Sequence, residues 1–296
     1  MEIDDRINGS TAVFGVIGNP IEHTLSPLIH NTMAKMLDTN LVYTSFHVKS
    51  SELEEAIRGA YKLGIKGLNI TVPHKKEIIK CLCSLDKTAE AVGAVNTIKY
   101  TDKGYVGYNT DMIGVYYALT GNGVTVQDKT VLVLGAGGAA NACAAMAAAK
   151  GAKKVYIANR TAEKALSLAE HIKGYYNIEI EALPISDIDD IDKCEIILNA
   201  TTLGFDENKG KTPVEDIGFF GRKGVETVFD AIYSPWETRL LSDSASQGVK
   251  TINGFDMLIY QAVAAREIWY DERLGADFRA QVRLELLQYY LGRNRT

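Results

Sequence analysis

The chain has 296 residues, of which 46% are hydrophobic and 23% charged, and its formal net charge is −5. This composition is ordinary for a globular protein and excludes an intrinsically disordered chain. Lysine and arginine are scattered along the sequence, so it lacks the basic cluster that binds nucleic acid or an anionic membrane surface. We therefore expect a small-molecule partner, and the length favours two domains.

Export signals and metal-binding patterns are also missing from the sequence. The stretch from Met1 to Asp5 is acidic, and no run of about 18 apolar residues occurs, so we expect a cytoplasmic protein without a membrane segment. The cysteines lack paired C-x-x-C spacing, which predicts reduced thiols in the core and no metal site. These cysteines are Cys81, Cys83, Cys143 and Cys194.

The first part of the chain alternates between apolar strand patterns and helix signals. This β-α-β-α order predicts a mostly parallel sheet. Ser26 is expected to be the N-cap of a helix with Pro27 at its first position, and Ser51 with Glu54 matches a capping box. Strands are expected at 12–18, 41–48 and 67–72, a short helix at about 74–83, and two short strands within 93–107.

A second series of strands and helices starts at Lys129. The pattern predicts an α/β fold with two domains, residues 1–111 plus 254–296 and residues 112–253, the C-terminal helices returning to the first domain. Strands are expected near 130–135, 154–158, 178–182, 195–200 and 225–230, and the chain from Phe255 on is expected to be helical.

A glycine-rich turn follows the first strand of the second series. In Gly135-x-Gly137-Gly138-x-Ala140, glycines permit a tight turn and let backbone N–H groups approach a pyrophosphate at a helix N-terminus. An ordinary strand-to-helix turn is the alternative, but the Ala-rich helix that follows favours a Rossmann-type doubly wound domain. The predicted cofactor-binding residues here are Gly135, Ala136, Gly137, Gly138 and Ala139.

The end of the next strand indicates which dinucleotide binds. An NAD site usually places Asp or Glu there for the ribose 2′-hydroxyl, whereas this chain has Asn159, Arg160 and Thr161. Arg160 can grip a 2′-phosphate, and Thr161 and Lys164 add a hydroxyl and a second positive charge. NADP(H) is therefore the expected cofactor, although Thr161 could also serve as a plain helix N-cap.

Polar residues gather at the expected carboxyl ends of the first-domain strands. Asn69 and Thr71 share a face of one strand, and Lys75 follows beyond Pro73. Thr24 and Ser26 follow the first strand. Ligands of open α/β sheets bind at this edge, so we expect a substrate site there.

Several of these segments together resemble the shikimate dehydrogenase family. The similarity runs in order from about residue 12 to residue 270. Its motifs are Thr24-Leu25-Ser26-Pro27, residues 67–75 (GLNITVPHK), Gly93-Ala94-Val95-Asn96-Thr97, Asn109-Thr110-Asp111, Asn199-Ala200-Thr201-Thr202, Asp230-x-x-Tyr233-x-Pro235 and Gly254-x-x-Met257-Leu258-x-x-Gln261-Ala262.

The resemblance implies an NADP-dependent enzyme that reduces 3-dehydroshikimate to shikimate reversibly, with Lys75 and Asp111 as the catalytic residues. His74 competes with Lys75 for the role of general acid/base. The first domain is expected to bind substrate and the second NADP, with Asn159, Arg160, Thr161, Lys164, Thr201, Gly254 and Met257 also at the cofactor. The implied substrate-binding residues are Thr24, Ser26, Asn69, Thr71, Lys75, Asn96, Asp111, Tyr233 and Gln261.

Two departures from the family pattern keep alternatives open. Thr24 stands where many members have Ser, which allows a dual quinate/shikimate dehydrogenase. Lys164 stands where several relatives have Arg, which weakens the grip on the 2′-phosphate. A non-catalytic NADP-sensing regulator is a further alternative, against which the presence of Lys75 with Asp111 argues. The sequence leaves open a monomer or a homodimer.

Overall fold

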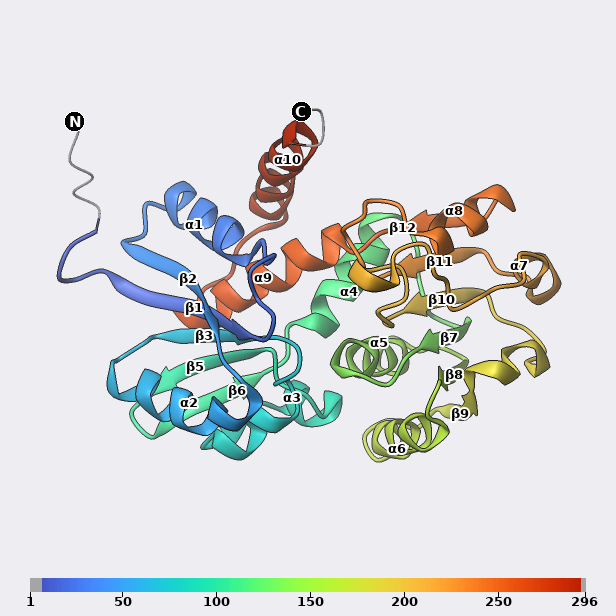
Figure 1. Ribbon diagram of the computed structural model, residues 1–296, viewed down its shortest axis with the longest axis horizontal. Helices are drawn as coiled ribbons and strands as arrows, with labels where there is room; N and C mark the ends of the chain where they lie inside the picture. The colour runs from blue at the N-terminus through green and yellow to red at the C-terminus, as the bar shows by residue number, and fades with distance from the viewer. Residues whose placement is uncertain (1–6, 294–296) are drawn as a thin grey trace. The chain divides into compact units, whose positions relative to one another are not determined.

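The computed structural model describes residues 7–293, which fold into two compact units (Figure 1). Unit 1 comprises the chain up to residue 90, residues 94–110 and the chain from residue 259 on, and unit 2 comprises residues 91–93 and 111–258. The second boundary falls between residues 258 and 259, five residues beyond the expected boundary between 253 and 254. The Gly254 N–H donates to the Ile232 carbonyl at 3.0 Å, which holds this turn within unit 2. Among the described residues, no helix is long and apolar enough to cross a membrane.

Unit 1 is built on a sheet that we call sheet A. Its strand order is β2-β1-β3-β5-β6-β4, with β1 parallel to both β2 and β3 and with β5 antiparallel to β3 and β6. The expected mostly parallel sheet therefore carries one antiparallel hairpin. The strands are β1 (Ala12–Gly18), β2 (Leu41–His47), β3 (Gly67–Ile70), β4 (Ser84–Leu85), β5 (Thr97–Thr101) and β6 (Gly104–Tyr108).

Side chains of β1 alternate between two cores, as the period of a strand requires. Phe14 and Val16 pack with Tyr43 of β2 and with Trp269 of helix α9 (Phe255–Tyr270). Ile17 belongs to the core on the other face, beneath α2 (Leu53–Lys62). Helix α9 therefore returns the end of the chain to unit 1, where α10 (Ala276–Arg293) follows it.

Three expected helix starts in unit 1 are wrong in detail. Ser26 is the first residue of α1 (Ser26–Met36) and not its N-cap, because its own N–H donates to the Thr24 hydroxyl at 3.2 Å. A 3₁₀ turn, η1 (Ser50–Glu52), precedes α2, and its Glu52 carboxylate, not that of Glu54, accepts the Lys49 N–H at 3.4 Å. The expected helix at 74–83 is the 3₁₀ segment η2 (Glu77–Cys81). These errors arise because neighbouring side chains compete for the same backbone donors.

The cysteine prediction holds only in part. All four thiols are free, and Cys143 and Cys194 are buried, but Cys81 is only half-buried and Cys83 is exposed. Cys83 leaves the core because it lies in the short connection between η2 and β4.

Unit 2 is built on sheet B, in which every pairing is parallel and the order is β12-β11-β10-β7-β8-β9. Counted from β7, this is the 3-2-1-4-5-6 order of the doubly wound Rossmann fold, with the switch point between β7 and β10. The strands are β7 (Thr130–Leu134), β8 (Lys154–Asn159), β9 (Glu179–Pro184), β10 (Ile196–Asn199), β11 (Thr227–Asp230) and β12 (Lys250–Ile252).

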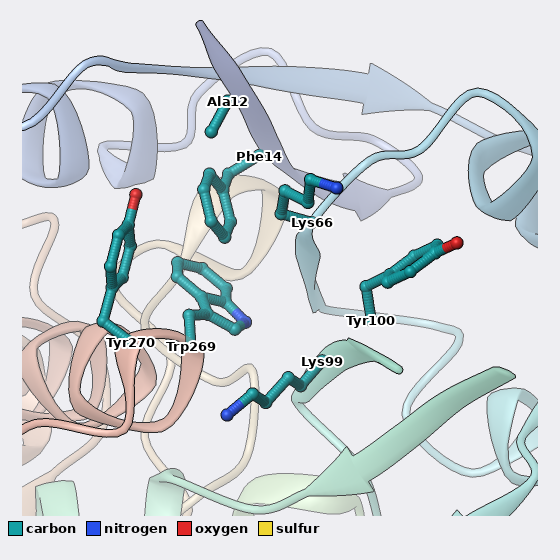
Figure 2. Close-up of a pocket in the computed structure, with 7 residues that line it drawn as sticks. All are labelled: Ala12, Phe14, Lys66, Lys99, Tyr100, Trp269 and Tyr270. Carbon is teal, nitrogen blue, oxygen red and sulfur yellow. The ribbon is translucent and has the colours of Figure 1, made fainter. Parts of the chain in front are cut away.

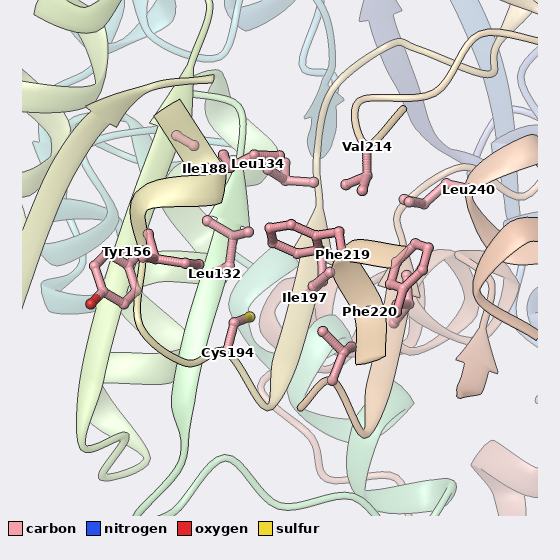
Figure 3. Packing of buried hydrophobic residues seen from close by; sticks show 14 of the residues in the cluster. Leu132, Leu134, Tyr156, Ile188, Cys194, Ile197, Val214, Phe219, Phe220 and Leu240 are labelled. Carbon is pink, nitrogen blue, oxygen red and sulfur yellow. The ribbon is translucent and has the colours of Figure 1, made fainter. Parts of the chain in front are cut away.

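Helices cover both faces of sheet B. Leu132 and Leu134 of β7 share a core with Phe219 and Phe220 of α7 (Gly218–Lys223) and with Leu240 of α8 (Arg239–Ser246), as Figure 3 shows. Figure 1 shows α5 (Gly138–Ala149) and α6 (Ala162–Lys173) together on the opposite face. Burial on both faces explains why the central strands β7 and β10 are almost continuously apolar, whereas the edge strands β9 and β12 also carry charged residues.

Candidate functional site

The glycine turn of unit 2 lies between β7 and α5, at the switch point of sheet B. Gly135 has φ +109°, and a Cβ there would lie 3.1 Å from the Ala200 carbonyl oxygen, so both conformation and space favour glycine. Gly137 is exposed, with nothing within 4 Å of the position a Cβ would take. The first N–H groups of α5, from Gly138 on, have no partner within the helix. This helix N-terminus fits a pyrophosphate.

The end of β8 carries cations and no acid. Asn159 shapes this loop because its side-chain amide donates to the Thr161 carbonyl at 2.9 Å. Arg160, Thr161 and Lys164 are exposed, and neither basic side chain forms an ion pair with any residue from 7 to 293. Thr161 occupies the N-cap position of α6 but makes no side-chain capping bond. Two unpaired cations beside a free hydroxyl fit a phosphate group.

A buried pair of polar side chains joins the loops that follow β10 and β11. The Asn199 amide donates to the Asp230 carboxylate at 3.0 Å, and the Asn199 carbonyl oxygen accepts from the N–H and hydroxyl of Thr201 at 3.1 and 2.8 Å. Asp230 also accepts from the Ile232 N–H at 3.1 Å and the Thr238 hydroxyl at 2.7 Å. The Thr201 hydroxyl therefore donates within its own loop, to Asn199. The bonds of Asp230 to Asn199 and to the Ile232 N–H orient the loop that carries Tyr233.

Burial raises the pKa of Asp230 to about 6, against the lowering effect of its three donors. Because the folded pKa lies above the unfolded value of 3.8, the folded chain binds this proton more tightly than the unfolded chain does. Protonation of Asp230 therefore stabilises the folded chain. Its contribution to the free energy of unfolding is complete below pH 3.8 and is lost as the pH rises to about 6.

We expect this titration to appear as a difference between the wild type and Asp230→Asn. The free energy of unfolding of the wild type, relative to the variant, should fall by on the order of 3 kcal/mol between pH 4 and pH 6.5 and then stay level. Urea titrations of both proteins across that range measure the difference, in which the other titrating groups cancel. A difference independent of pH would contradict the raised pKa.

The turn before α9 packs closely on unit 2. A Cβ on Gly254 would lie 2.1 Å from the Ala231 carbonyl oxygen, so no other residue fits without a backbone shift. Met257 is buried three residues further, in the first turn of α9. The contact of Gly254 with Ala231 thus places Gly254 and Met257, both predicted cofactor residues, beside the end of β11.

In unit 1, the carboxyl ends of β1 and β3 are joined by backbone hydrogen bonds. The Thr71 N–H donates to the Ile17 carbonyl at 2.9 Å, and the Asn19 N–H donates to the Val72 carbonyl at 3.0 Å. A Cβ on Gly18 would lie 2.5 Å from the Thr71 methyl group, so glycine is needed there. The structure therefore brings the loop with Thr24 and the strand end with Thr71 to the same edge of sheet A.

Four predicted substrate residues form two hydrogen-bonded pairs at this edge. The Thr24 hydroxyl donates to Ser26 at 3.1 Å, and the Asn69 amide donates to the Asn96 carbonyl at 3.2 Å. Ser26, Asn69 and Asn96 are buried, whereas Thr24 is half-buried.

Tyr43, Thr97 and Thr110 bond to the second pair, as described below. None of the three was predicted as a site residue, although Thr97 and Thr110 lie within the family motifs at 93–97 and 109–111. For Tyr43, the only signal in the sequence was a polar residue within an apolar strand pattern.

Lys75 lies in the turn that follows β3, and it is half-buried. Its backbone carbonyl accepts from the Val95 N–H at 2.8 Å, which places it next to the Asn96 segment. The neighbouring His74 is 0% exposed and bonds through Nε2 to the Val48 carbonyl at 2.8 Å. Because His74 faces the core, Lys75 is the better placed of the two competitors for proton transfer.

The other predicted site residues are distributed between the two units. Asp111 is buried as the first residue of α4 (Asp111–Gly121), where the helix dipole favours a negative charge. Gln261 lies half-buried in the part of α9 that belongs to unit 1, and Tyr233 follows β11 in unit 2. Within residues 7–293, no cluster of His, Cys, Asp and Glu could hold a metal ion.

A pocket of about 180 Å³ in unit 1 contains none of the predicted site residues (Figure 2). Ala12 begins β1 and Lys66 precedes β3, so this pocket lies at the amino ends of the strands, away from Thr71. Its walls are aromatic, with Phe14 and Trp269 at 4.8 Å between ring centroids. Cavity size alone therefore does not identify the site.

The fold and the glycine turn define a two-unit α/β protein with a Rossmann-type dinucleotide-binding unit. Residues 16–98 match the model of the shikimate dehydrogenase substrate binding domain, and residues 119–204 match that of shikimate / quinate 5-dehydrogenase. A relative named shikimate dehydrogenase (NADP(+)) from Methanocaldococcus jannaschii is 44% identical over 265 residues, 89% of this chain and 93% of that one. The chain belongs to the shikimate dehydrogenase family.

Solved structures of the family have the same two-unit fold. A shikimate 5-dehydrogenase from Listeria monocytogenes, in complex with shikimate and NAD, has a TM-score of 0.86 and 33% identity, covering 95% of this chain and 99% of that one. A shikimate dehydrogenase in complex with NADP+ has a TM-score of 0.82 and 39% identity, covering 94% and 96%. The predicted fold class is thereby confirmed.

Proposed function

We propose that this chain is an NADP-dependent shikimate dehydrogenase, an oxidoreductase that reversibly reduces 3-dehydroshikimate to shikimate in aromatic amino acid biosynthesis. The observation that carries the proposal is that a Rossmann glycine turn and a network of buried hydroxyls and amides occur in one chain of this family. We further propose that the enzyme acts in the cytoplasm as a monomer or a homodimer, which light scattering after size-exclusion chromatography would distinguish.

The preference for NADP rests on the end of β8. A carboxylate there would repel a 2′-phosphate, whereas Arg160 and Lys164 are exposed cations without ion-pair partners among the described residues. The named relatives agree with this preference, since the Methanocaldococcus jannaschii relative is named as an NADP(+) enzyme and one solved neighbour contains NADP+; the Listeria monocytogenes neighbour contains NAD. When bound, the nicotinamide supplies the hydride acceptor and donor that the reaction requires.

The substrate edge of sheet A suits a cyclic polyol with a carboxylate. Hydroxyls such as those of Thr24 and Ser26 can donate to a carboxylate, and the amide oxygen of Asn69 can accept from a ring hydroxyl through its remaining lone pair. We assign the contacts with substrate to Thr24, Ser26, Asn69, Thr71, Asn96, Tyr233 and Gln261, together with the catalytic residues.

We assign proton transfer to Lys75. As the alcohol is oxidised, its hydroxyl proton passes from oxygen to the Lys75 Nζ, and in the reverse direction the ammonium returns a proton to the carbonyl oxygen. Asp111 is the second catalytic residue and provides a carboxylate that favours the protonated amine. The half-burial of Lys75 limits access of water to the transferred proton.

A spectrophotometric assay that crosses shikimate and quinate with NADP and NAD tests this function. We expect the highest kcat/KM for shikimate with NADP. Comparable values for quinate would identify the dual enzyme, which Thr24 and the shikimate / quinate family model both allow. NADP binding without oxidation of either alcohol would reject the enzyme and support a sensor.

Replacing Arg160 tests the assignment of the cofactor. We expect Arg160→Ala to raise the KM for NADP by about 10- to 100-fold, because a charge-assisted bond to phosphate is lost. The KM for NAD, which has no 2′-phosphate, should change by less than about twofold. Arg58→Ala, an exposed arginine in α2, is the control and should leave both values unchanged. Equal changes in the KM for NADP and the KM for NAD would show that Arg160 does not bind the 2′-phosphate.

A further inference from the structure

Tyr43 of β2 contacts a predicted substrate residue of unit 1. Its hydroxyl donates to the Asn69 carbonyl oxygen at 2.7 Å. Ser26 lies close enough to the phenol to offset part of the rise that burial causes in the pKa of Tyr43. Since Tyr43 is only 2% exposed, its phenol lies behind these residues and not at the surface that a ligand meets.

The bonds around Asn69 fix the orientation of its amide. Its Nδ2 donates to the Asn96 carbonyl at 3.2 Å and to the Thr97 hydroxyl at 3.0 Å, so its Oδ1 faces Tyr43. Both hydrogens of the amide are thereby used. Tyr43 donates to the Asn69 Oδ1, and the opposite amide orientation would place this oxygen against the Asn96 carbonyl and bring two acceptors together.

The Asn69 bonds continue to the second asparagine of the predicted site. The Thr97 hydroxyl donates to the Asn96 Oδ1 at 3.0 Å, and the Thr110 N–H donates to the same oxygen at 2.8 Å. Thr97 and Thr110 are almost completely buried. A chain of hydrogen bonds therefore runs from Tyr43 through Asn69 and Thr97 to Asn96.

The ring of Tyr43 is held in place by its neighbours. His30 of α1 stacks on it at 4.2 Å between ring centroids and at an interplanar angle of 9°, and Trp269 of α9 lies at 6.2 Å. Burial lowers the pKa of His30 to about 3, so the stacked imidazole is neutral at physiological pH. The phenol thus has little freedom to move away from Ser26 and Asn69.

We propose that Tyr43 is a positioning residue for substrate binding, whose phenol holds the Asn69 amide in the orientation that receives the substrate. This inference rests on the proposed function, because it takes the substrate to bind where Asn69 lies. Tyr43 itself touches neither substrate nor cofactor. Its effect is therefore expected in the affinity for shikimate and not in the affinity for NADP.

The test compares Tyr43→Phe with Tyr105→Phe in the full chain. Tyr105 is an equally buried tyrosine of unit 1, and its hydroxyl donates to the Ile65 carbonyl at 2.7 Å, outside the network. Each variant keeps its ring and loses one buried hydrogen bond, so we expect similar falls in the thermal unfolding midpoint. Only Tyr43→Phe should raise the KM for shikimate, by about 5- to 30-fold, with the KM for NADP unchanged.

A double-mutant cycle between Tyr43→Phe and Asn69→Ala separates a positioning role from a purely structural one. If Tyr43 acts through Asn69, the double variant should show a smaller rise in the KM for shikimate than the product of the single effects. If Tyr43→Phe does not fold, Thr97→Val, which removes the other side-chain anchor of Asn69, should give the same selective rise.

The outcomes separate the two hypotheses. A wild type that oxidises shikimate, with equal KM values in Tyr43→Phe and Tyr105→Phe, would overturn the positioning role. Additive effects in the cycle would also overturn it. A wild type that oxidises no shikimate would instead reject the proposed function.

Discussion

Lys75→Ala should lower kcat for shikimate oxidation by about 10²- to 10⁴-fold, with a small change in the KM for NADP. The reason is that a positioned general acid/base contributes this much to a proton transfer, and the neighbouring His74 faces the core. Steady-state kinetics of the purified variant measure the loss. Added methylamine should restore part of the rate, because a small amine can supply the missing base.

Lys76→Ala is the matched control, since Lys76 is the next residue and is exposed. It should keep kcat within about twofold of the wild type, because a solvated side chain contributes little. A Lys75→Ala variant that is folded, as judged by circular dichroism, and retains near wild-type kcat would show that another group transfers the proton.

Asp111→Asn is expected to lower kcat/KM for shikimate by about 10²-fold or more. The amide has nearly the same shape as the carboxylate, but it carries no charge and cannot stabilise an ammonium. The position at the start of α4 suits a negative charge, so the variant also loses a favourable interaction with the helix dipole. Steady-state kinetics and the thermal unfolding midpoint of the same preparation separate the catalytic loss from the structural one.

Glu195→Gln serves as the control for loss of a buried acid in unit 2. Glu195 precedes β10 at the amino end of sheet B, where it accepts the Thr130 N–H at 2.9 Å and pairs with Lys129 at 3.2 Å. This variant should lose stability without a matching loss of kcat/KM. If Asp111→Asn behaves like Glu195→Gln, the role of Asp111 is limited to orientation.

The architecture was predictable because its signals are local. Alternating strand and helix patterns identified sheet B and most of sheet A, and the glycine turn at Gly135 identified the nucleotide-binding helix. Short elements were missed, because β4 and β12 contain only two and three residues and so carry no detectable period. The start of α1 was misplaced because Thr24 supplies the accepting hydroxyl.

For the candidate site, the sequence predicted which residue types gather at the strand ends, and in unit 1 hydrogen bonds join Thr24 to Ser26 and Asn69 to Asn96. The sequence could not show which hydrogen bonds these side chains form. The Asn69 amide has its hydrogens occupied by Asn96 and Thr97, which narrows its capacity to bind substrate to the remaining lone pair of Oδ1.

By itself, the sequence determined the family, the Rossmann turn and the absence of an acid at the end of β8, because these are properties of neighbouring residues. Only the tertiary structure decided that His74 is buried, that Gly254 packs on Ala231, and that the Tyr43 hydroxyl donates to Asn69. The physical reason is distance along the chain. Tyr43 and Asn69 are 26 residues apart and meet only because β2 and β3 both pair with β1.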